Sequence, residues 1–460
     1  MARGVRDVFK GARLSVIPIS DGGDGLIDAL SAALGGVRVA AAVRGPLGER
    51  RRASYLWIAP KNLAVIEMAR ASGLALVPPA RRRPLRATSR GTGDLMRDAV
   101  RRGARTIIVG MGGTAASDGG AGMARALGAR LLDVKDRELP DGAHALLRLE
   151  RVDARAVRSL LSGVRVIALS DVSNPLLGVQ GSARVFGPQK GASPAQVKLI
   201  ERALTRWALV LARDLGVRVA RAPGAGAAGG LGAGLLAFAR AELVPGADWV
   251  LKKTGALKAL RNSDFALTAE GRLDRTSLYG KAPVSLARAA KKRGVPCAAI
   301  GGQVEDAARP LLRRTGMTSI VSFSQAGARS KNDAMINAAK WARTAAALAV
   351  LSLALVMIGP RRAAANGFSA VDELYFHRNL SGKLDENIKL LEGSADPESL
   401  WRLCRAKVRR GEEREKKADK LADYAAAKKD CEASVALSSA SADAHFWLGV
   451  AMGRWGEAKG

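Results

Sequence analysis

The sequence has few histidines and cysteines, and this scarcity excludes several kinds of site. Only three histidines occur in 460 residues, and the N-terminal two-thirds contains one of them, His144. A histidine metal centre or an ordinary Ser/His/Asp triad is therefore excluded from that part of the chain. The three cysteines, Cys297, Cys404 and Cys431, follow no motif spacing, so neither a disulfide framework nor a zinc site is predicted.

Aromatic residues make up only 4% of the chain, although its formal net charge of +32 would suit a nucleic-acid binder. The basic excess is scattered arginine along helical stretches, and no recognisable nucleic-acid module is present. A solvated, arginine-rich surface that favours anionic substrates is the preferred interpretation, and no nucleic-acid partner is expected. No signal peptide begins at Met1.

The most informative stretch present is 105–129, which is rich in glycine. Residues 106–109 form a short apolar run typical of a strand buried in a parallel sheet, and a helix is expected from Ala121. A glycine loop between a strand and a helix can point backbone N–H groups at a phosphate. The alternative is a tight crossover without a ligand. The loop glycines are Gly110, Gly112, Gly113, Gly119, Gly120 and Gly122.

The same pattern recurs, because apolar runs end at an acid or a glycine pair. Strands are expected at 14–19, 63–68, 106–109, 164–169, 264–268, 296–300 and 318–323, with a possible hairpin of 38–43 and 53–58. The residues at their ends are Asp21, Glu67, Gly112 with Gly113, Asp171, Glu270, and Gly301 with Gly302. In open α/β sheets such ends share one crevice. Carboxylates, amides and cations in one crevice suit Mg²⁺-dependent phosphoryl transfer.

For any single acid in this set, the alternative role is to cap a helix. Two further sets of residues also have more than one interpretation. One group stands before an expected helix and is interpreted as caps or ligand contacts: Thr88, Ser89, Thr92 and Asp94. The other is a literal GxGxxG at Gly224, Gly226 and Gly229. It lacks a clean preceding strand and a following acid, so a dinucleotide site is not favoured.

Eight segments in one order resemble the bacterial glycerate kinase family. They are SDGGDG (20–25), VIEMARASGLALVPP (65–79), PLRATSRGTGDL (84–95), MGGTAASDGGAGM (111–123), SDVSNPLLG (170–178), VFGPQKGAS (185–193), PGAGAAGGLGAGL (223–235) and AEGRLDRTSLYGKAP (269–283). The resemblance implies a cytoplasmic enzyme that phosphorylates glycerate with ATP and Mg²⁺, without a Walker A loop. Whether the 2- or the 3-hydroxyl is phosphorylated stays open.

The resemblance also implies an α/β fold. A flavodoxin-like domain would be built from 1–80 and 281–350, with a second α/β domain, 81–280, inserted between its parts. The family's acidic motif positions match Asp21, Glu67, Asp118, Asp171, Glu270 and Asp274, and its cationic positions match Lys190, Arg272 and Lys281.

Roles follow from chemistry rather than from the resemblance. Asp171 or Asp274 is expected to act as the base, and Glu270 or Asp118 to face the metal. Arg272 or Lys281 would pair with the substrate carboxylate or a phosphate. The glycine loops would bind the nucleotide through Asp21, Gly22, Gly23, Gly112, Gly113, Asp118, Gly119 and Gly120.

Some features depart from the family pattern. The family opens with a strand and a loop before the helix that begins here at Met1, so the first strand is expected to be missing and kinase activity impaired. Ala269 replaces a frequent glycine, and Arg90 replaces a frequent aromatic residue.

The C-terminal third has a different character. Residues 344–366 form an apolar helix, which is either the last kinase helix or a membrane anchor or internal signal segment, with 344–359 as its apolar part. Residues 367–460 resemble an incomplete tetratricopeptide segment, with helices expected at 399–408, 418–436 and 442–456. The alternative function is therefore an inactive scaffold whose C-terminal helices bind a protein partner.

Overall fold

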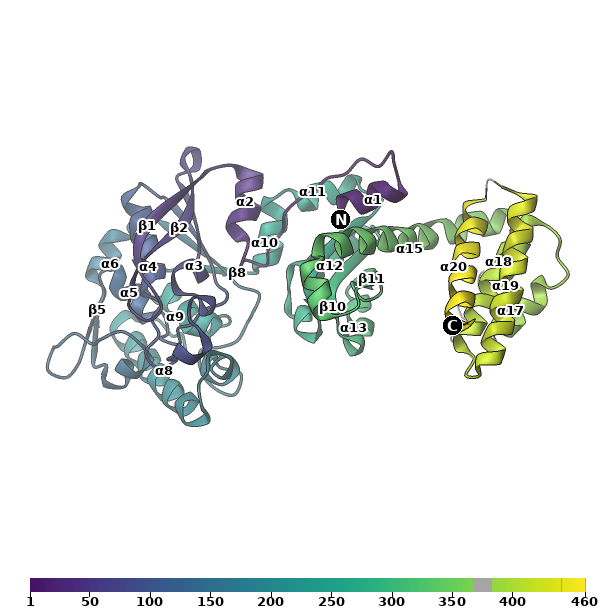
Figure 1. Cartoon of the computed structure of the whole chain (residues 1–460). Helices are drawn as coiled ribbons and strands as arrows, with labels where there is room; N and C mark the ends of the chain where they lie inside the picture. Colours follow the sequence, from purple (N-terminus) through teal and green to yellow (C-terminus); the bar gives the residue numbers. More distant parts are fainter. Residues whose placement is uncertain (367–382, 440, 460) are drawn as a thin grey trace. The chain divides into compact units, whose positions relative to one another are not determined.

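The computed structural model describes residues 1–366, 383–439 and 441–459, which form two compact units, 1–353 and 354–460 (Figure 1). The first unit contains two α/β sheets. The larger sheet has the order β1-β2-β3-β4-β7-β8. Its strands are β1 (Val37–Arg44), β2 (Arg50–Ile58), β3 (Leu63–Glu67), β4 (Thr106–Gly110), β7 (Arg165–Leu169) and β8 (Glu242–Val244).

The larger sheet is parallel from β3 to β8, and β1 and β2 form the expected antiparallel hairpin. Successive side chains of β4 point to opposite faces of the sheet. Ile107 and Val109 face the main core, whereas Ile108 packs with α2 (Leu26–Leu34) and α10 (Gly246–Lys253). Helices therefore cover both faces, as a buried parallel sheet requires.

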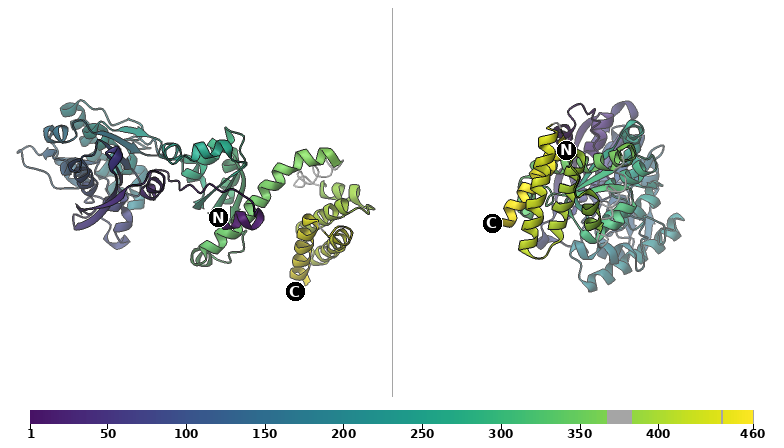
Figure 2. Two further views of the ribbon diagram at one scale, coloured as in Figure 1. Left: turned by 90° about the horizontal axis from the view of Figure 1, so that it is seen from above. Right: turned by 90° about the vertical axis from the view of Figure 1, so that its right-hand side faces the viewer.

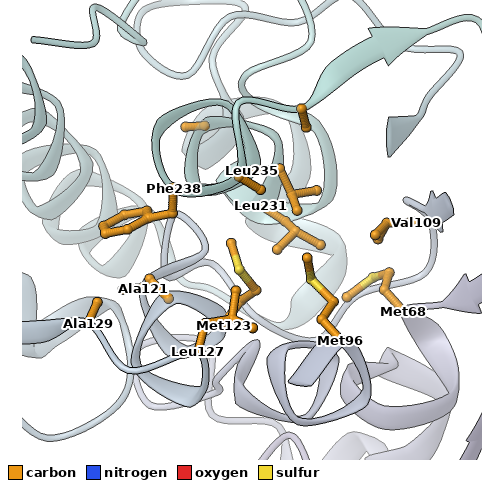
Figure 3. Packing of buried hydrophobic residues seen from close by; sticks show 14 of the residues in the cluster. Met68, Met96, Val109, Ala121, Met123, Leu127, Ala129, Leu231, Leu235 and Phe238 are labelled. Atoms are coloured by element: carbon orange, nitrogen blue, oxygen red, sulfur yellow. The ribbon is translucent and has the colours of Figure 1, made fainter. Parts of the chain in front are cut away.

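Several helices surround the main core of this sheet. They are α3 (Ala69–Ser72), α4 (Arg90–Arg101), α5 (Ala121–Ala126), α6 (Arg155–Leu160), α7 (Ser182–Phe186), α8 (Pro194–Leu215) and α9 (Ala227–Ala239). Figure 3 shows Met96 and Met123 packed against Leu231 of α9. A short antiparallel pair, β5 (Arg130–Leu132) and β6 (Arg151–Asp153), lies beyond α5 in the chain.

The smaller sheet is parallel, with the order β11-β10-β9. Its strands are β9 (Ala266–Leu273), β10 (Cys297–Val304) and β11 (Met317–Ser322), and the helices near it in the chain are α11 (Ala256–Ala259), α12 (Ala282–Lys291), α13 (Arg309–Arg314) and α14 (Lys331–Ile336). Cys297 and Ala299 share a core with α12 and α13, whereas Ala298 and Ile300 pack against α15 (Ala338–Asn366).

The N-terminal half of α15 contains the first part of the apolar segment, which was expected to be either the last kinase helix or a membrane anchor or signal segment. Ala345, Ala349 and Leu353 are buried against the smaller sheet. Arg343 forms an ion pair with Asp7 of α1 (Ala2–Val8). This part of the helix is thus a packing helix of the first unit. Within the described residues, no helix is long and apolar enough to cross a membrane.

Two expectations about the first unit differ from the structure. No strand forms at 14–19, because Pro18 has no N–H to donate and no strand pairs with this segment. Residues 12–20 instead run from α1 to α2 without regular structure (Figure 2). Ile17 and Ile19 pack on the core of the smaller sheet. Of the strands within 37–67, β3 pairs with β4, and β1 and β2 extend the same sheet. The two sheets therefore separate between β8 and β9, rather than at 80 and 281 as the expected division would require.

The second unit is helical. It contains α17 (Lys383–Leu391), α18 (Pro397–Glu413), α19 (Lys417–Leu437) and α20 (Ala442–Lys459), and the expected C-terminal helices are confirmed. The prediction of no disulfide was wrong, because Cys404 of α18 and Cys431 of α19 form one, with their Cα atoms 5.5 Å apart. Sequence spacing did not reveal it, since only the packing of the two helices brings the cysteines together. Residues 367–382 of the expected segment lie outside the described residues.

Candidate active site

The loop 20–25 packs onto the carboxyl ends of β4 and β7. Gly22 has φ of +94°, and a Cβ on it would lie 2.8 Å from Cβ of Leu169. Any side chain here would therefore push the loop off the sheet. Gly23 N donates to Oδ1 of Asp21 at 2.9 Å, which fixes that carboxylate beside the strand ends.

Asp171 follows β7 and lies next to Asp21. The N–H of Ala247, at the start of α10, donates to Oδ1 of Asp171 at 3.2 Å. The pKa of the Asp171 carboxyl is raised to about 7, chiefly by burial. The hydrogen bond from Ala247 opposes this rise, and the charges of Asp21 and Asp248 contribute to it. A carboxyl that titrates near neutral pH is suited to take a proton from a hydroxyl.

The segment after β9 reaches the same place. Its link to Asp171 is Gly280, where a Cβ would lie 3.3 Å from Cβ of Asp171. Lys281 Nζ lies 2.7 Å from Oε1 of Glu270. Burial raises the pKa of Glu270, Lys281 opposes this rise, and Asp21 contributes to it. Carboxylates from both sheets therefore interact here.

Asp274 has a different environment from Asp171. It caps the 3₁₀ turn that follows, where Thr276 N donates to Oδ1 at 2.9 Å, and Arg272 Nε lies 3.1 Å from Oδ2. Partial burial acts to raise the pKa of Asp274, but Thr276, Lys281 and Arg272 outweigh it and hold the pKa below its ordinary value. Of the two expected bases, Asp171 has the more suitable pKa.

The first half of the glycine loop faces the loop 20–25 and has open amides, that is, backbone N–H groups for which the described part of the chain offers no acceptor. A Cβ on Gly112 would lie 3.1 Å from Cα of Gly23. The N–H groups of Gly112, Gly113 and Thr114 have no acceptor among the described residues. Three successive donors without an acceptor can bind an anion.

The second half of the loop is closed by the protein itself. Asp118 is 1% exposed, and its carboxylate accepts hydrogen bonds from Ser89 N at 2.8 Å, Gly122 N at 3.1 Å and Gly120 N at 3.2 Å. Gly119 N donates to the carbonyl of Gly229. Asp118 thus accepts hydrogen bonds from the amides that were expected to bind a phosphate, while its burial raises the pKa of its carboxyl. The amides of Gly119 and Gly120 are already used, whereas those of 112–114 have no acceptor in the ranges that the structure describes.

The remaining candidates hold the structure around this loop. Glu67 Oε1 accepts from Ile27 N at 2.8 Å and caps α2, as its alternative interpretation predicted. Ser89 and Thr88 bond to Asp118, Thr92 to Ser72, and Asp94 accepts from Arg44 N. Gly301 and Gly302 lie within β10 rather than in a loop; Gly301 pairs with Glu270.

The GxGxxG segment has a packing role. Ala228, Gly229 and Gly230 all have left-handed backbone conformations inside the span of α9. A Cβ on Gly230 would lie 2.8 Å from Cα of Gly119, so two glycine segments pack backbone against backbone. Gly224 and Gly226 lie in the turn just before this segment, where Ala227 N donates to the carbonyl of Gly224.

Sequence reasoning overlooked two features of the site. Arg70 Nε lies 2.5 Å from Oε2 of Glu67, and its two terminal nitrogens have no acceptor among the described residues. The spacing of three from Glu67 on a helical turn was a usable signal. The burial of Lys190 was also missed, because nothing in GPQKG indicates a buried ammonium.

Metal ligands are not gathered in advance. In the parts of the chain that the structure describes, no group of three or more His, Cys, Asp or Glu side chains has the arrangement of a metal site. Both oxygens of Asp118 are occupied by protein donors. Oε2 of Glu270 is buried without a hydrogen-bond partner, so this atom has unused capacity to accept a cation.

The fold is mixed α/β, and acidic side chains and open amides lie at the carboxyl ends of its strands, where α/β enzymes generally bind their ligands. Residues 1–353 match the glycerate kinase family, and the chain belongs to that family of ATP-dependent kinases. Residues 369–460 match the family described as regulator of microtubule dynamics protein 1-3, a helical module that fits the expected repeat-like segment.

Individual relatives support this membership. The chain is 44% identical to the glycerate kinase of Halalkalibacterium halodurans over 66% of this chain and 80% of the relative. It is 42% identical to glycerate 2-kinase of Escherichia coli K12, again over 66% and 80%. A crystal structure from Salmonella typhimurium LT2 with the provisional name glycerate kinase 2 has a TM-score of 0.66 and 38% identity, covering 77% of this chain and 92% of that chain. The expected impairment has no support in these comparisons.

Proposed function

We propose that this protein transfers the γ-phosphoryl group of ATP to a hydroxyl of glycerate. The observation that carries the proposal is the meeting of Asp21, Asp171 and the Glu270–Lys281 pair beside the open amides of 112–114. Family membership and relatives named for glycerate support the substrate. Together these residues would provide a base, cations and an anion site within the first unit.

In this mechanism Asp171 accepts the proton of the substrate hydroxyl as the oxygen attacks the γ-phosphorus. The bond to the bridging oxygen breaks, and ADP leaves. Asp171 is chosen over Asp274 because burial raises its pKa to about 7, whereas the pKa of Asp274 is lowered. A base whose pKa lies near the working pH gives the most effective proton transfer.

We assign the nucleotide phosphates to the N–H groups of Gly112, Gly113 and Thr114. Gly22 and Gly23 shape the facing loop, while Asp118, Gly119 and Gly120 hold the loop closed behind these amides. Lys281, Arg272 and Arg70 are the cations available to the phosphates or to the glycerate carboxylate. Arg272 is 64% exposed and Arg70 31% exposed, so both side chains can reach a ligand.

Mg²⁺ is proposed as the cofactor that accompanies ATP. An anionic nucleotide entering a crevice with several carboxylates needs a divalent cation to offset repulsion. Glu270, through its unpartnered Oε2, and Asp21 are the residues that would hold it. When bound, the ion would offset negative charge on the transferring phosphoryl group. Mg²⁺ is usually held by one or two carboxylates together with phosphates, so no cage formed in advance is required.

The proposal is tested with an ADP-release assay on glycerate, Mg²⁺ and ATP, and ³¹P NMR of the product identifies the phosphorylated hydroxyl. D171N should lower kcat by about 100-fold or more, because a positioned general base typically contributes that much. D264N changes an exposed aspartate and is the matched control. Normal turnover by D171N would exclude the assigned base.

The scaffold alternative predicts a different result. It requires that wild-type protein show neither turnover nor a rise in melting temperature with Mg-ATP and glycerate together, since ligand binding to the native state must stabilise it. The match of 369–460 to a separate helical family is the observation that keeps a protein partner of this segment as a second proposal.

A further inference from the structure

Lys190 is a buried ammonium behind the glycine loop. It ends the 3₁₀ turn Pro188–Lys190 and is 2% exposed. Its Nζ donates to the carbonyl of Ala116 at 2.5 Å and to Oγ of Ser117 at 3.3 Å. A Cβ on Gly229 would lie 2.8 Å from this Nζ, so the space around the ammonium is tightly filled.

This position is costly for a lysine. Burial lowers the pKa of Lys190 to about 7, and the opposing charge that favours its protonated form is Asp118. A hydrophobic side chain of similar length would avoid the desolvation cost of a buried charge. The lysine therefore serves something other than stability alone.

What Lys190 holds is the middle of the loop. Before it, Leu74 N donates to Gly113 O at 2.6 Å and Ala115 N to Ser72 O at 3.0 Å. After it, Asp118 closes the helix start through its own hydrogen bonds. Between these two anchors, Ala116 O and Ser117 Oγ are held by Lys190 Nζ. Removing this contact leaves the residues between the open amides and Asp118 without their tie to the 3₁₀ turn.

We propose that Lys190 is a positioning residue for nucleotide binding: it fixes Ala116 and Ser117 so that the amides of Gly112–Thr114 stay aligned for phosphate. The inference rests on the proposed kinase function and extends it. Lys190 does not touch the nucleotide, because it lies beneath the loop and its ammonium is bonded to the loop itself.

The first test compares wild type, K190M and the control K198M, which removes an exposed lysine at the start of α8. K190M should raise KM for ATP by about tenfold, the lower end of what loss of a supporting interaction behind a binding site costs. KM for glycerate and kcat should change by less than about twofold. Equal rises in both KM values, or no change in KM for ATP, would overturn the proposal.

Hydrogen exchange gives a second readout that does not depend on turnover. Peptides covering 111–118 should exchange faster in K190M than in wild type, whereas peptides of α8 should not change. Unchanged exchange at 111–118 would also overturn the proposal. If wild type fails to phosphorylate glycerate, the proposed function falls, but the exchange comparison still decides the role of Lys190. Should K190M not fold, S117A removes one acceptor and should shift KM for ATP and exchange in the same direction.

Discussion

Replacing Asp171 by asparagine should make the folded protein more stable at the same time as it removes activity. The pKa of Asp171 is raised from 3.8 to about 7, chiefly by burial. A shift of roughly three units corresponds to about 4 kcal/mol of penalty for the ionised carboxylate. The side chain is partly exposed, so solvent screening reduces this to about 2 kcal/mol. Asparagine keeps an oxygen for the hydrogen bond from Ala247.

The effect of D171N on the free energy of unfolding should depend on pH. Between about pH 4 and 7 the folded state keeps the proton on Asp171 while the unfolded chain has lost it, so the stability contributed by this group falls as pH rises. D171N should therefore match wild type near pH 4. At pH 8 its free energy of unfolding should be about 2 kcal/mol higher, which corresponds to a gain of roughly 4–8 °C in melting temperature for a domain of this size.

The assay is thermal unfolding of wild type, D171N and D264N at intervals from pH 4.5 to 8.5, followed by a signal from the larger sheet. D264N should have the same pH dependence of melting temperature as wild type, because the Asp264 side chain is exposed. A D171N protein that is equally destabilised at every pH would refute the reasoning, since it would show that the carboxylate stabilises the fold rather than straining it.

Three further results are expected. G229A should destabilise the larger sheet by about 2 kcal/mol or more, because φ is +70° and a Cβ would overlap the carbonyl of Ala116, whereas G271A, in open space, should change unfolding little. C404S should lower the stability of the helical unit by about 3 kcal/mol, seen as a separate melting step that reductant shifts in wild type only. The free energy of unfolding of wild type, relative to that of K190M, should rise from about pH 7 to pH 10, because Lys190 loses its proton at a lower pH in the folded state than in the unfolded chain. A difference between the two proteins that does not change with pH in denaturant titrations would contradict the lowered pKa.

The sequence predicted well those elements whose residues decide their own structure. The apolar run of β4 and the hairpin of β1 and β2 form where their patterns place them. The prediction of a strand at 14–19 was wrong, because the apolar pattern of a segment cannot show whether a neighbouring strand exists to pair with it. The disulfide was missed for a similar reason, because the packing of α18 against α19 decides whether Cys404 and Cys431 come together.

The strand ends predicted that Asp21, Asp171 and Gly112 lie close together, because parallel strands share an edge. The structure places the three residues near the carboxyl ends of β4 and β7, and their roles stay predictions. The division of the glycine loop could not be predicted. It depends on Asp118, whose partner Ser89 lies 29 residues away in the sequence, and on donors whose use only the fold determines.

The contact between Gly119 and Gly230 has a consequence for biosynthesis. These residues are far apart in the chain, and the glycine loop after β4 packs against a segment that is synthesised much later. A nascent chain that has emerged as far as the end of α8 already has Lys190 and Trp207, which bond to this loop, but it lacks the backbone of α9 that packs on Gly119. The packing of the loop can therefore be completed only after α9 has left the ribosome.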